Sequence, residues 1–464
     1  MRSLRNWCTG RRPVHSFEKH VGFAAAFSAA ALIMPAPAAA QSTPATPAVT
    51  ASTVGQTQPA QSVADFYKAR KGAPLWLSRE AGDSAEQLLT LFRTANVDGL
   101  SPDKYFTIEL QSLLDRARAK NKPKDIQRAD EALSEAFVAY VDDLRQDPGV
   151  GITWVDPSLK PQAPSALAAL LQASAAPSIS NYVADLGWMH PFYGELRDAI
   201  AQHKYSDDHQ REILELNLKR ARVLPATKER YVLVNAAQQR LFMYEDGKAV
   251  DNMVVVVGQT KYPTPMLAAY IRYAALNPYW YVPPDLAWED VGQWVEKYGY
   301  SYFERMGYEQ VDDWTKTPQV LDATKIDWDA VRDGKAQVLL RQKPGPNNFM
   351  GRIKFMFPNQ FGVYLHDNPR RELFKQSTRY FSGGCVRLED AWRLSRWLFH
   401  RELSWEGHGT EEPVMLDQPV PVYITYMTAV PDGQSIAYYD DAYGRDKAKL
   451  ASSDIDAGSA AAKR

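Results

Sequence analysis

The chain has little cysteine, no excess of either charge and no long apolar run. Its 464 residues hold 2 cysteines and nearly equal charges, 54 Lys plus Arg against 55 Asp plus Glu. Without a positive field to hold a polyanion, we expect no nucleic-acid partner. The apolar stretch at residues 21–34 is shorter than the roughly 20 residues that a membrane span needs.

The N-terminus nevertheless has the pattern of an export signal. Basic residues precede the apolar stretch, and Ala38-Ala39-Ala40 follows it as a small-residue cleavage site. We predict a signal peptide at 1–40 and a periplasmic mature protein, with an uncleaved anchor or a buried core helix as alternatives. Cleavage would remove Cys8 and leave Cys385, which is then either buried and inert or kept for its chemistry.

The remaining sequence, 45% hydrophobic overall, predicts two or three folded domains. Residues 41–62, rich in Ala, Thr, Pro, Gln and Ser, indicate a disordered linker, and 447–464 a disordered tail. Apolar residues at helical spacing predict a helical scaffold domain over 63–215. Short β-prone runs such as 231–234, 241–244 and 422–426 predict a β-rich catalytic domain over 216–446, interrupted by an α/β lid at about 285–335. The predicted fold class is therefore α+β and multidomain.

One segment carries the residues of a nucleophilic site. Ser382-Gly383-Gly384-Cys385-Val386-Arg387 leads toward an amphipathic helix, so we expect Cys385 just outside a helix N-terminus. The helix dipole, Arg387 and a histidine would each favour the thiolate. The glycines let the backbone approach a substrate carbonyl, where the Cys385 amide can face the oxyanion.

His366 supplies the candidate base. It ends the strand-like Tyr364-Leu365 and precedes the turn Asp367-Asn368-Pro369. A histidine there can accept the thiol proton and return it to a leaving amine, although a lone histidine could simply cap the turn. A cysteine flanked by glycines and arginine, with an upstream histidine, is the pair that cysteine acyl transfer requires.

These motifs together resemble a known family. His366-Asp367 followed by the segment 382–387 is similar to the active-site signature of the YkuD-type L,D-transpeptidases, and in particular of their large YcbB-like subtype. The likeness extends over nearly all of the mature chain. Further similar segments lie at 66–67, 74–76, 98–100, 217–220, 224–225, 277–284, 341–342, 344–348 and 351–355.

The resemblance implies a reaction and its residues. Cys385 would attack the carbonyl after the L-centre of diaminopimelate in a tetrapeptide stem, release D-alanine and pass the acyl group to a second stem. His366 would be base and then acid, with Arg387 and Gly384 in the catalytic loop and Tyr364, Ser382 and Gly383 in the substrate pocket. It implies that the reaction needs no metal or organic cofactor. It also implies carbapenem-type β-lactams as inhibitors and proteins of cell-wall synthesis as partners.

The chain departs from the subtype in one respect. The stretch between 204 and 213 is too short for the peptidoglycan-binding module that large members carry there. We expect wall recruitment to fall to the lid, the scaffold or a partner.

Several alternatives stay open. His408-Gly409-Thr410 follows the cysteine, so it ranks below His366 as base. The lid aromatics can stack on sugars or simply pack, and the pairs Asp312-Asp313 and Asp440-Asp441 are more typical of solvated turns than of a metal site. The alternative functions are an L,D-carboxypeptidase or endopeptidase, a protein-to-wall ligase, and a non-catalytic wall-binding scaffold.

Overall fold

The computed structural model describes residues 62–226, 228–315 and 317–452. The predicted signal peptide, residues 41–61 of the linker and 453–464 of the tail lie outside these residues. Within them, no helix combines the length and apolar character needed to cross a bilayer.

The first part of the described chain is helical. Ser62 caps α1, because its hydroxyl accepts a hydrogen bond from the Asp65 amide at 3.1 Å. Pro123 opens the 23-residue helix α4, which buries Leu133, Phe137 and Tyr140 on one face. The helices are α1 Val63–Ala69, α2 Ser84–Arg93, α3 Thr107–Lys120, α4 Pro123–Arg145, α5 Ala166–Ser174, α6 Ile179–Ala184, α7 Pro191–Ala201 and α8 Asp208–Ala221. The predicted scaffold boundary at 215 falls inside α8, whose buried residues continue to Ala221.

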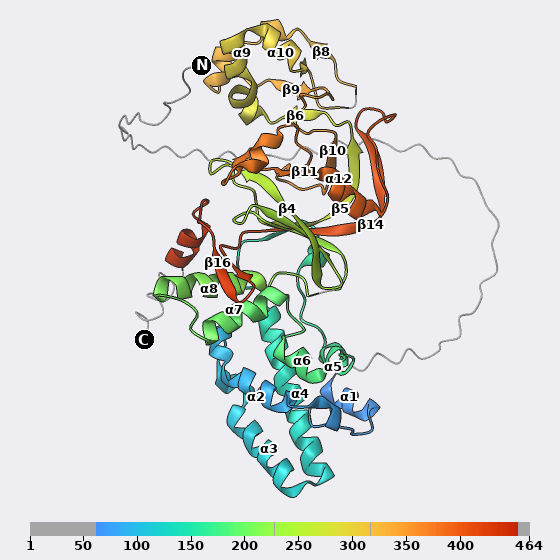
Figure 1. The fold of residues 1–464 in the computed structure, drawn as a ribbon, viewed down its shortest axis with the longest axis vertical. Helices are drawn as coiled ribbons and strands as arrows, with labels where there is room; N and C mark the ends of the chain where they lie inside the picture. Colours follow the sequence, from blue (N-terminus) through green and yellow to red (C-terminus); the bar gives the residue numbers. More distant parts are fainter. Residues whose placement is uncertain (1–61, 227, 316, 453–464) are drawn as a thin grey trace, which may run out of the picture. The chain divides into compact units, whose positions relative to one another are not determined.

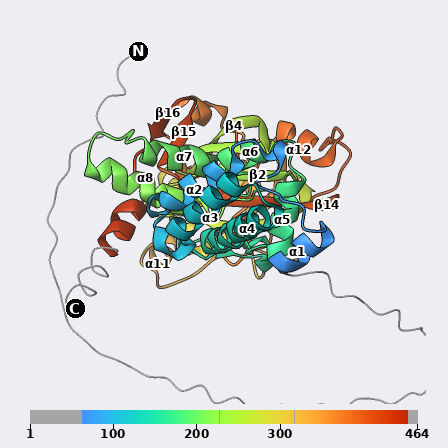
Figure 2. The same cartoon turned by 90° about the horizontal axis from the view of Figure 1, so that it is seen from below.

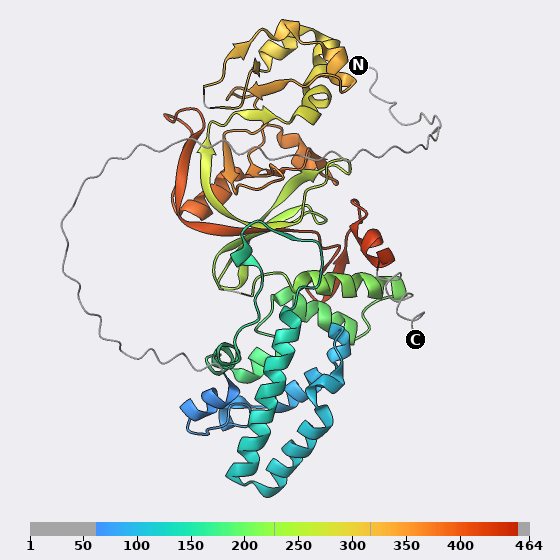
Figure 3. The same cartoon turned by 180° about the vertical axis from the view of Figure 1, so that it is seen from behind.

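A sheet that closes on itself follows (Figures 1 and 3). The strand order is β1-β5-β10-β11-β13-β4-β3-β2-β14, β12 pairs with β4, and β14 also pairs with β5. Closure leaves few free strand edges. The strands are β1 Thr153–Trp154, β2 Tyr231–Asn235, β3 Arg240–Glu245, β4 Lys248–Gly258, β5 Leu267–Leu276, β10 Ile353–Met356, β11 Leu365–His366, β12 Tyr380–Ser382, β13 Val386–Leu388 and β14 Glu412–Thr425. Helix α12, Ala391–Phe399, follows β13.

Two apolar cores hold this part of the molecule together. One lies against the sheet and includes Leu365, Val386 and Leu394. The other joins the scaffold helices to the sheet through Tyr231 and Tyr423. In Figure 2 the helices α2 to α5 lie in front of β2 and β14.

The lid has its own sheet and core. Its strands, in the order β6-β9-β7-β8, are β6 Trp280–Val282, β7 Tyr308–Val311, β8 Val320–Leu321 and β9 Leu339–Gln342. Its helices are η5 Pro284–Leu286, the π-helix η6 Ala287–Gly292, α9 Gln293–Tyr298, α10 Tyr300–Arg305, η7 Ala323–Lys325 and α11 Trp328–Arg332. The insertion is wider than the predicted 285–335, because β6 and β9 pair with each other and form its stem.

The C-terminal segment also differs from its prediction. A hairpin of β15 Ala429–Asp432 and β16 Ser435–Tyr438 follows β14. Residues 445–452 are helical, so the predicted disordered tail is wrong for 447–452. Asp446 anchors this helix, because it pairs with Arg220 at 2.6 Å and accepts a hydrogen bond from Thr428 at 2.5 Å. The predicted fold class itself, a helical scaffold before a sheet-rich catalytic domain with a mixed α/β lid, is confirmed.

Candidate active site

The parallel pair of β11 and β13 positions the predicted catalytic residues. Leu365 lies opposite Val386 and His366 opposite Arg387. Leu365 and Val386 are fully buried in the sheet core. Because side chains alternate along a strand, His366 and Arg387 point to the other face of the sheet.

The same register places Cys385 beside Tyr364. The Val386 amide donates to the Tyr364 carbonyl at 3.1 Å, which continues the pairing by one residue. With strands about 4.8 Å apart and a rise of about 3.3 Å per residue, the Cα atoms of Cys385 and His366 are roughly 8 Å apart on adjacent strands. The structure therefore brings Cys385, His366, Arg387 and Tyr364 together on one face.

The turn before Cys385 is held by internal hydrogen bonds. The Ser382 hydroxyl donates to the Cys385 carbonyl at 2.6 Å and accepts from the Gly384 amide at 3.1 Å. Ser382 is 1% exposed, so its hydroxyl braces the turn and is not available to a substrate, contrary to its predicted place in the pocket. Gly384 has φ +112°, which favours glycine, and its amide is already used within the turn. Its role in the structure is conformational, which leaves the Cys385 amide as the candidate oxyanion donor.

Two residues behind this turn were missed by the sequence analysis. The Thr264 hydroxyl donates to the Gly384 carbonyl at 2.8 Å and accepts from the Gly258 amide at 2.8 Å. A Cβ atom on Gly258 would lie 2.0 Å from the Tyr262 carbonyl oxygen. Thr264 and Gly258 therefore hold in place residues 382–385, the turn that carries the nucleophile (the nucleophile turn). A threonine between two prolines has no local signal for this role.

The expected helix N-terminus at Cys385 is wrong. Cys385 precedes β13, and α12 begins only at Ala391, where Asp390 accepts a hydrogen bond from the Arg393 amide at 2.9 Å. The dipole effect of a helix fades beyond its first turn. It therefore does not favour a thiolate at Cys385.

The electrostatics of the pair follow from burial. Burial raises the pKa of the half-buried Cys385 thiol and outweighs the Tyr364 backbone, Arg387 and Lys354, which lower it. Burial, reinforced by the Arg387 charge, lowers the pKa of His366 to about 3. Thiol and imidazole are therefore both neutral at pH 7, so proton transfer accompanies attack.

The tautomer of His366 suits a base. Its Nδ1 atom lies 2.6 Å from the Asp367 carbonyl oxygen. A carbonyl can only accept, so Nδ1 carries the proton and Nε2 keeps its lone pair. In this tautomer Nε2 is the nitrogen whose lone pair can take the thiol proton.

The lid covers part of this face. A Cβ atom on Gly383 would lie 2.6 Å from Cδ1 of Leu286, so Gly383 faces the lid. Burial raises the pKa of Asp290, on the π-helix η6, to about 6, while the Arg387 guanidinium lowers it. Glu289 accepts hydrogen bonds from Lys261 and, at 3.3 Å, from the Tyr262 hydroxyl. These contacts join the lid to the nucleophile turn and its support.

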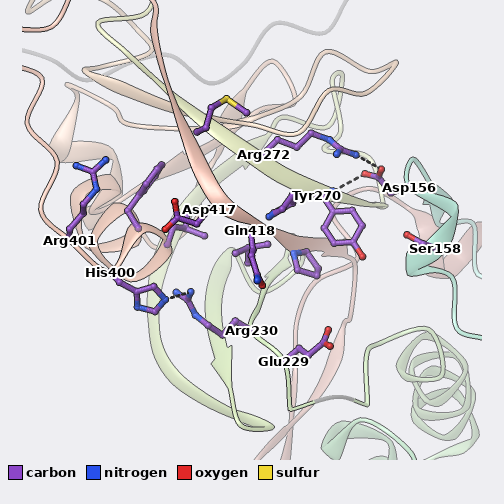
Figure 4. Close-up of a pocket in the computed structure, with 16 residues that line it drawn as sticks. Asp156, Ser158, Glu229, Arg230, Tyr270, Arg272, His400, Arg401, Asp417 and Gln418 are labelled. Carbon is purple, nitrogen blue, oxygen red and sulfur yellow. Dashed lines mark hydrogen bonds and ion pairs between the residues drawn. The ribbon is translucent and has the colours of Figure 1, made fainter. Parts of the chain in front are cut away.

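A large cavity is lined by other residues (Figure 4). It has a volume of about 940 Å³, and neither Cys385 nor His366 lines it. Two of its three arginines have partners: Arg272 pairs with Asp156 at 2.6 Å, and Arg230 contacts His400 at 2.6 Å. It lacks the predicted nucleophile and base, and we assign no chemistry to it.

His408 and the two aspartate pairs, the alternatives that the sequence left open, make other contacts. His408 pairs with Glu412 at 2.8 Å. Asp312 and Asp441 accept backbone hydrogen bonds in turns. Over the described part of the chain, no group of three or more His, Cys, Asp or Glu side chains could hold a metal ion.

The lid aromatics divide between two settings. Phe303 is buried in the lid core at 1% exposure. Trp294 and Tyr298 are exposed, and their rings stack with centroids 6.0 Å apart. Packing thus accounts for some of the aromatics, and the exposed pair is free to contact a ligand.

Two family models match successive parts of the chain. Residues 229–422 match the YkuD family, described as an L,D-transpeptidase catalytic domain, and residues 61–200 match the Scaffold domain family. The chain is 26% identical over 410 residues to the "Putative L,D-transpeptidase" of Haemophilus influenzae, covering 83% of this chain and 78% of that protein.

Solved structures give weaker likenesses. The Ldtfm-avibactam carbamoyl enzyme is 15% identical with a TM-score of 0.21, covering 43% of this chain and 50% of that one. The catalytic domain of the E. faecium L,D-transpeptidase is also 15% identical, with a TM-score of 0.20, covering 43% of this chain and 98% of that one. At these TM-scores the likeness carries no argument. The domain matches do: the chain carries a YkuD L,D-transpeptidase catalytic domain at 229–422 and a Scaffold domain at 61–200, the two domains that the resemblance to the YcbB-like subtype predicts.

Proposed function

We propose that this protein is an exported peptidoglycan L,D-transpeptidase that joins the diaminopimelate residues of two stem peptides through a thioester on Cys385. The observation that supports it most directly is the register of β11 and β13, which sets His366 and Cys385 on one face of the sheet. The pair has the groups that acyl transfer needs: a nucleophile, a neutral base and nearby backbone amides.

In the first half-reaction, the Cys385 sulfur attacks the carbonyl carbon after the L-centre of the donor diaminopimelate. His366 takes the thiol proton as the C–S bond forms. Negative charge develops on the carbonyl oxygen, where the Cys385 amide is the candidate donor. The C–N bond to D-alanine then breaks, and His366 returns the proton to the leaving amine.

In the second half-reaction, the side-chain amine of another stem attacks the thioester. His366 accepts a proton from this amine and the C–S bond breaks. The thiol is regenerated and an amide cross-link forms. Arg387, on the same face, would stabilise negative charge during both steps, and Tyr364 would line the pocket.

The test uses the mature protein and tetrapeptide-stem muropeptides, with products followed by mass spectrometry. We expect dimers lighter by one D-alanine, absent with Cys385→Ala. Tripeptide monomers without dimers would instead favour the carboxypeptidase alternative. Absence of both products would contradict the proposal.

We also propose that residues 1–40 are removed during export to the periplasm. The basic flank, the short apolar stretch and the Ala38-Ala39-Ala40 site support this. N-terminal sequencing of protein from the periplasmic fraction should begin at Gln41. Recovery of an intact N-terminus in the membrane fraction would favour the anchor alternative.

A further inference from the structure

Three polar side chains form a row across neighbouring strands of the sheet. Lys354 on β10 lies opposite His366 on β11, and His366 lies opposite Arg387 on β13. The residue after Lys354, Phe355, is fully buried in the sheet core. Lys354 therefore points to the same face as His366, which stands between two cations.

The Lys354 ammonium is held in place. Its Nζ atom lies 2.7 Å from Oε1 of Glu411, and its side chain is 8% exposed. Oε2 of the same carboxylate accepts a hydrogen bond from the Tyr281 hydroxyl of β6 at 2.9 Å. Nζ also lies 5.7 Å from the centroids of the Tyr281 and Tyr364 rings. The charge is thus fixed and poorly screened by water.

Stability is a poor reason for such a pair. A buried ion pair is often no more stable than apolar residues of the same volume. Glu411 also has φ +54°, an uncommon conformation for a residue other than glycine. The effect of the ammonium on its neighbours offers another reason for the arrangement.

The charged groups around His366 come from several elements. The cations Lys354 and Arg387 are its direct neighbours across the strands. The anions are engaged with other partners: Asp367 pairs with Arg371 at 2.7 Å, Glu411 pairs with Lys354, and Asp290 of the lid faces Arg387. Lys354 and Arg387 both lower the pKa of His366 and of Cys385.

We propose that Lys354 is a positioning residue of the reaction: its ammonium, held by Glu411, adds to the groups that disfavour a positive charge on His366 and favours negative charge on Cys385 as the thiol proton leaves. The inference rests on the proposed function only in taking Cys385 as the nucleophile and His366 as the base. Lys354 need not touch the substrate. Its charge acts through the two residues that do.

The test is the pH dependence of Cys385 alkylation by iodoacetamide, with the adduct quantified on the Cys385 peptide. The reagent needs no peptidoglycan, so this result is independent of cross-linking activity. We compare the wild type with Lys354→Met and with Lys354→Arg, which keeps the charge. The control is Lys343→Met, which removes a lysine that pairs with Glu309 at 3.6 Å beside the lid sheet.

Loss of the charge should move the midpoint of the rate profile of Lys354→Met upward by about one pH unit, so that alkylation is about tenfold slower below the midpoint. Lys354→Arg and Lys343→Met should keep the wild-type midpoint. A merely structural role would lower the rate at every pH without moving the midpoint, and that result would overturn the proposal. If Lys354→Met does not fold, Lys354→Gln, whose amide can still donate to Glu411, decides by the same shift.

Discussion

His366 lies directly opposite Arg387 in the parallel pair of β11 and β13. This one register decides which side chains share the active face. A slip by one residue would turn Leu365 toward the active face and His366 into the apolar core. The buried Leu365 and Val386 oppose such a slip, so the core side of the sheet sets the geometry of the catalytic side.

The Thr264 hydroxyl forms hydrogen bonds with two glycines: Gly384, within the nucleophile turn, and Gly258, behind it. Thr264→Val removes its hydrogen bonds to Gly384 and Gly258 in a fully buried position. We expect a loss of about 1–3 kcal/mol in the free energy of unfolding and slower carbapenem acylation of Cys385. Thr264→Ser, which keeps the hydroxyl, should stay near wild type in both. Denaturant unfolding and intact-protein mass spectrometry measure the two effects, and equal behaviour of Val and Ser would rule out the hydroxyl as the support.

Gly258 has no room for a side chain. Gly258→Ala would force its methyl group against the Tyr262 carbonyl oxygen, 2.0 Å from the Cβ position, and displace the segment that carries Thr264. We expect destabilisation of about 1–3 kcal/mol and at least tenfold slower acylation of Cys385. Gly345→Ala is the matched control, because nothing lies within 4 Å of its Cβ position. Thermal unfolding should separate the two variants, and identical melting curves would contradict this account of the turn.

His190 should make stability depend on pH. Burial lowers the pKa of His190 to about 3, below the unfolded value near 6.5. The folded state therefore binds fewer protons than the unfolded state in this range. The contribution of the neutral His190 to the free energy of unfolding is complete above pH 6.5 and falls by about 1.4 kcal/mol per pH unit as the pH drops toward 3.

Replacing this imidazole should flatten the acid side of the stability profile. In His190→Phe, the free energy of unfolding should fall less steeply between pH 6.5 and 4 than in wild type. His209→Phe, at a side chain that is 74% exposed, should follow the wild-type slope. Urea unfolding at several pH values measures the slopes, and parallel slopes for wild type and His190→Phe would show that His190 is not the titrating group.

Leu286 should limit access to the nucleophile from the lid side. Leu286→Ala shortens the side chain that lies against Gly383. We expect Cys385 to react several-fold faster with a bulky maleimide while its reaction with iodoacetamide changes little. Leu321→Ala, at an exposed position on β8, is the control. If the ratio of the two rates stayed at the wild-type value, the lid contact would not restrict entry.

The sequence and the structure agree best where the signal is local. Apolar spacing predicted the helix after the nucleophile, and Ala391, Leu394 and Leu398 are its buried face in α12. The prediction fails before this helix, because Val386-Arg387-Leu388 forms the strand β13 and separates Cys385 from the helix N-terminus. The nucleophile therefore lacks the predicted helix dipole.

What the sequence could not reveal depends on long-range pairing. Lys354 lies opposite His366 because of the register of β10 and β11. Thr264 donates a hydrogen bond to the Gly384 carbonyl, 120 residues later in the chain. The stem of the lid forms because Tyr281 pairs with Arg341. No periodicity or turn motif encodes such contacts.

The central claim is that Cys385 and His366 act as one acyl-transfer pair. Its most direct test is time-resolved intact-protein mass spectrometry of the mature protein mixed with a tetrapeptide stem, with peptide mapping of the adduct. We expect a thioester-linked tripeptide on Cys385, formed at least a hundredfold more slowly in His366→Gln. An adduct on another residue, or equal rates in wild type and His366→Gln, would contradict the account.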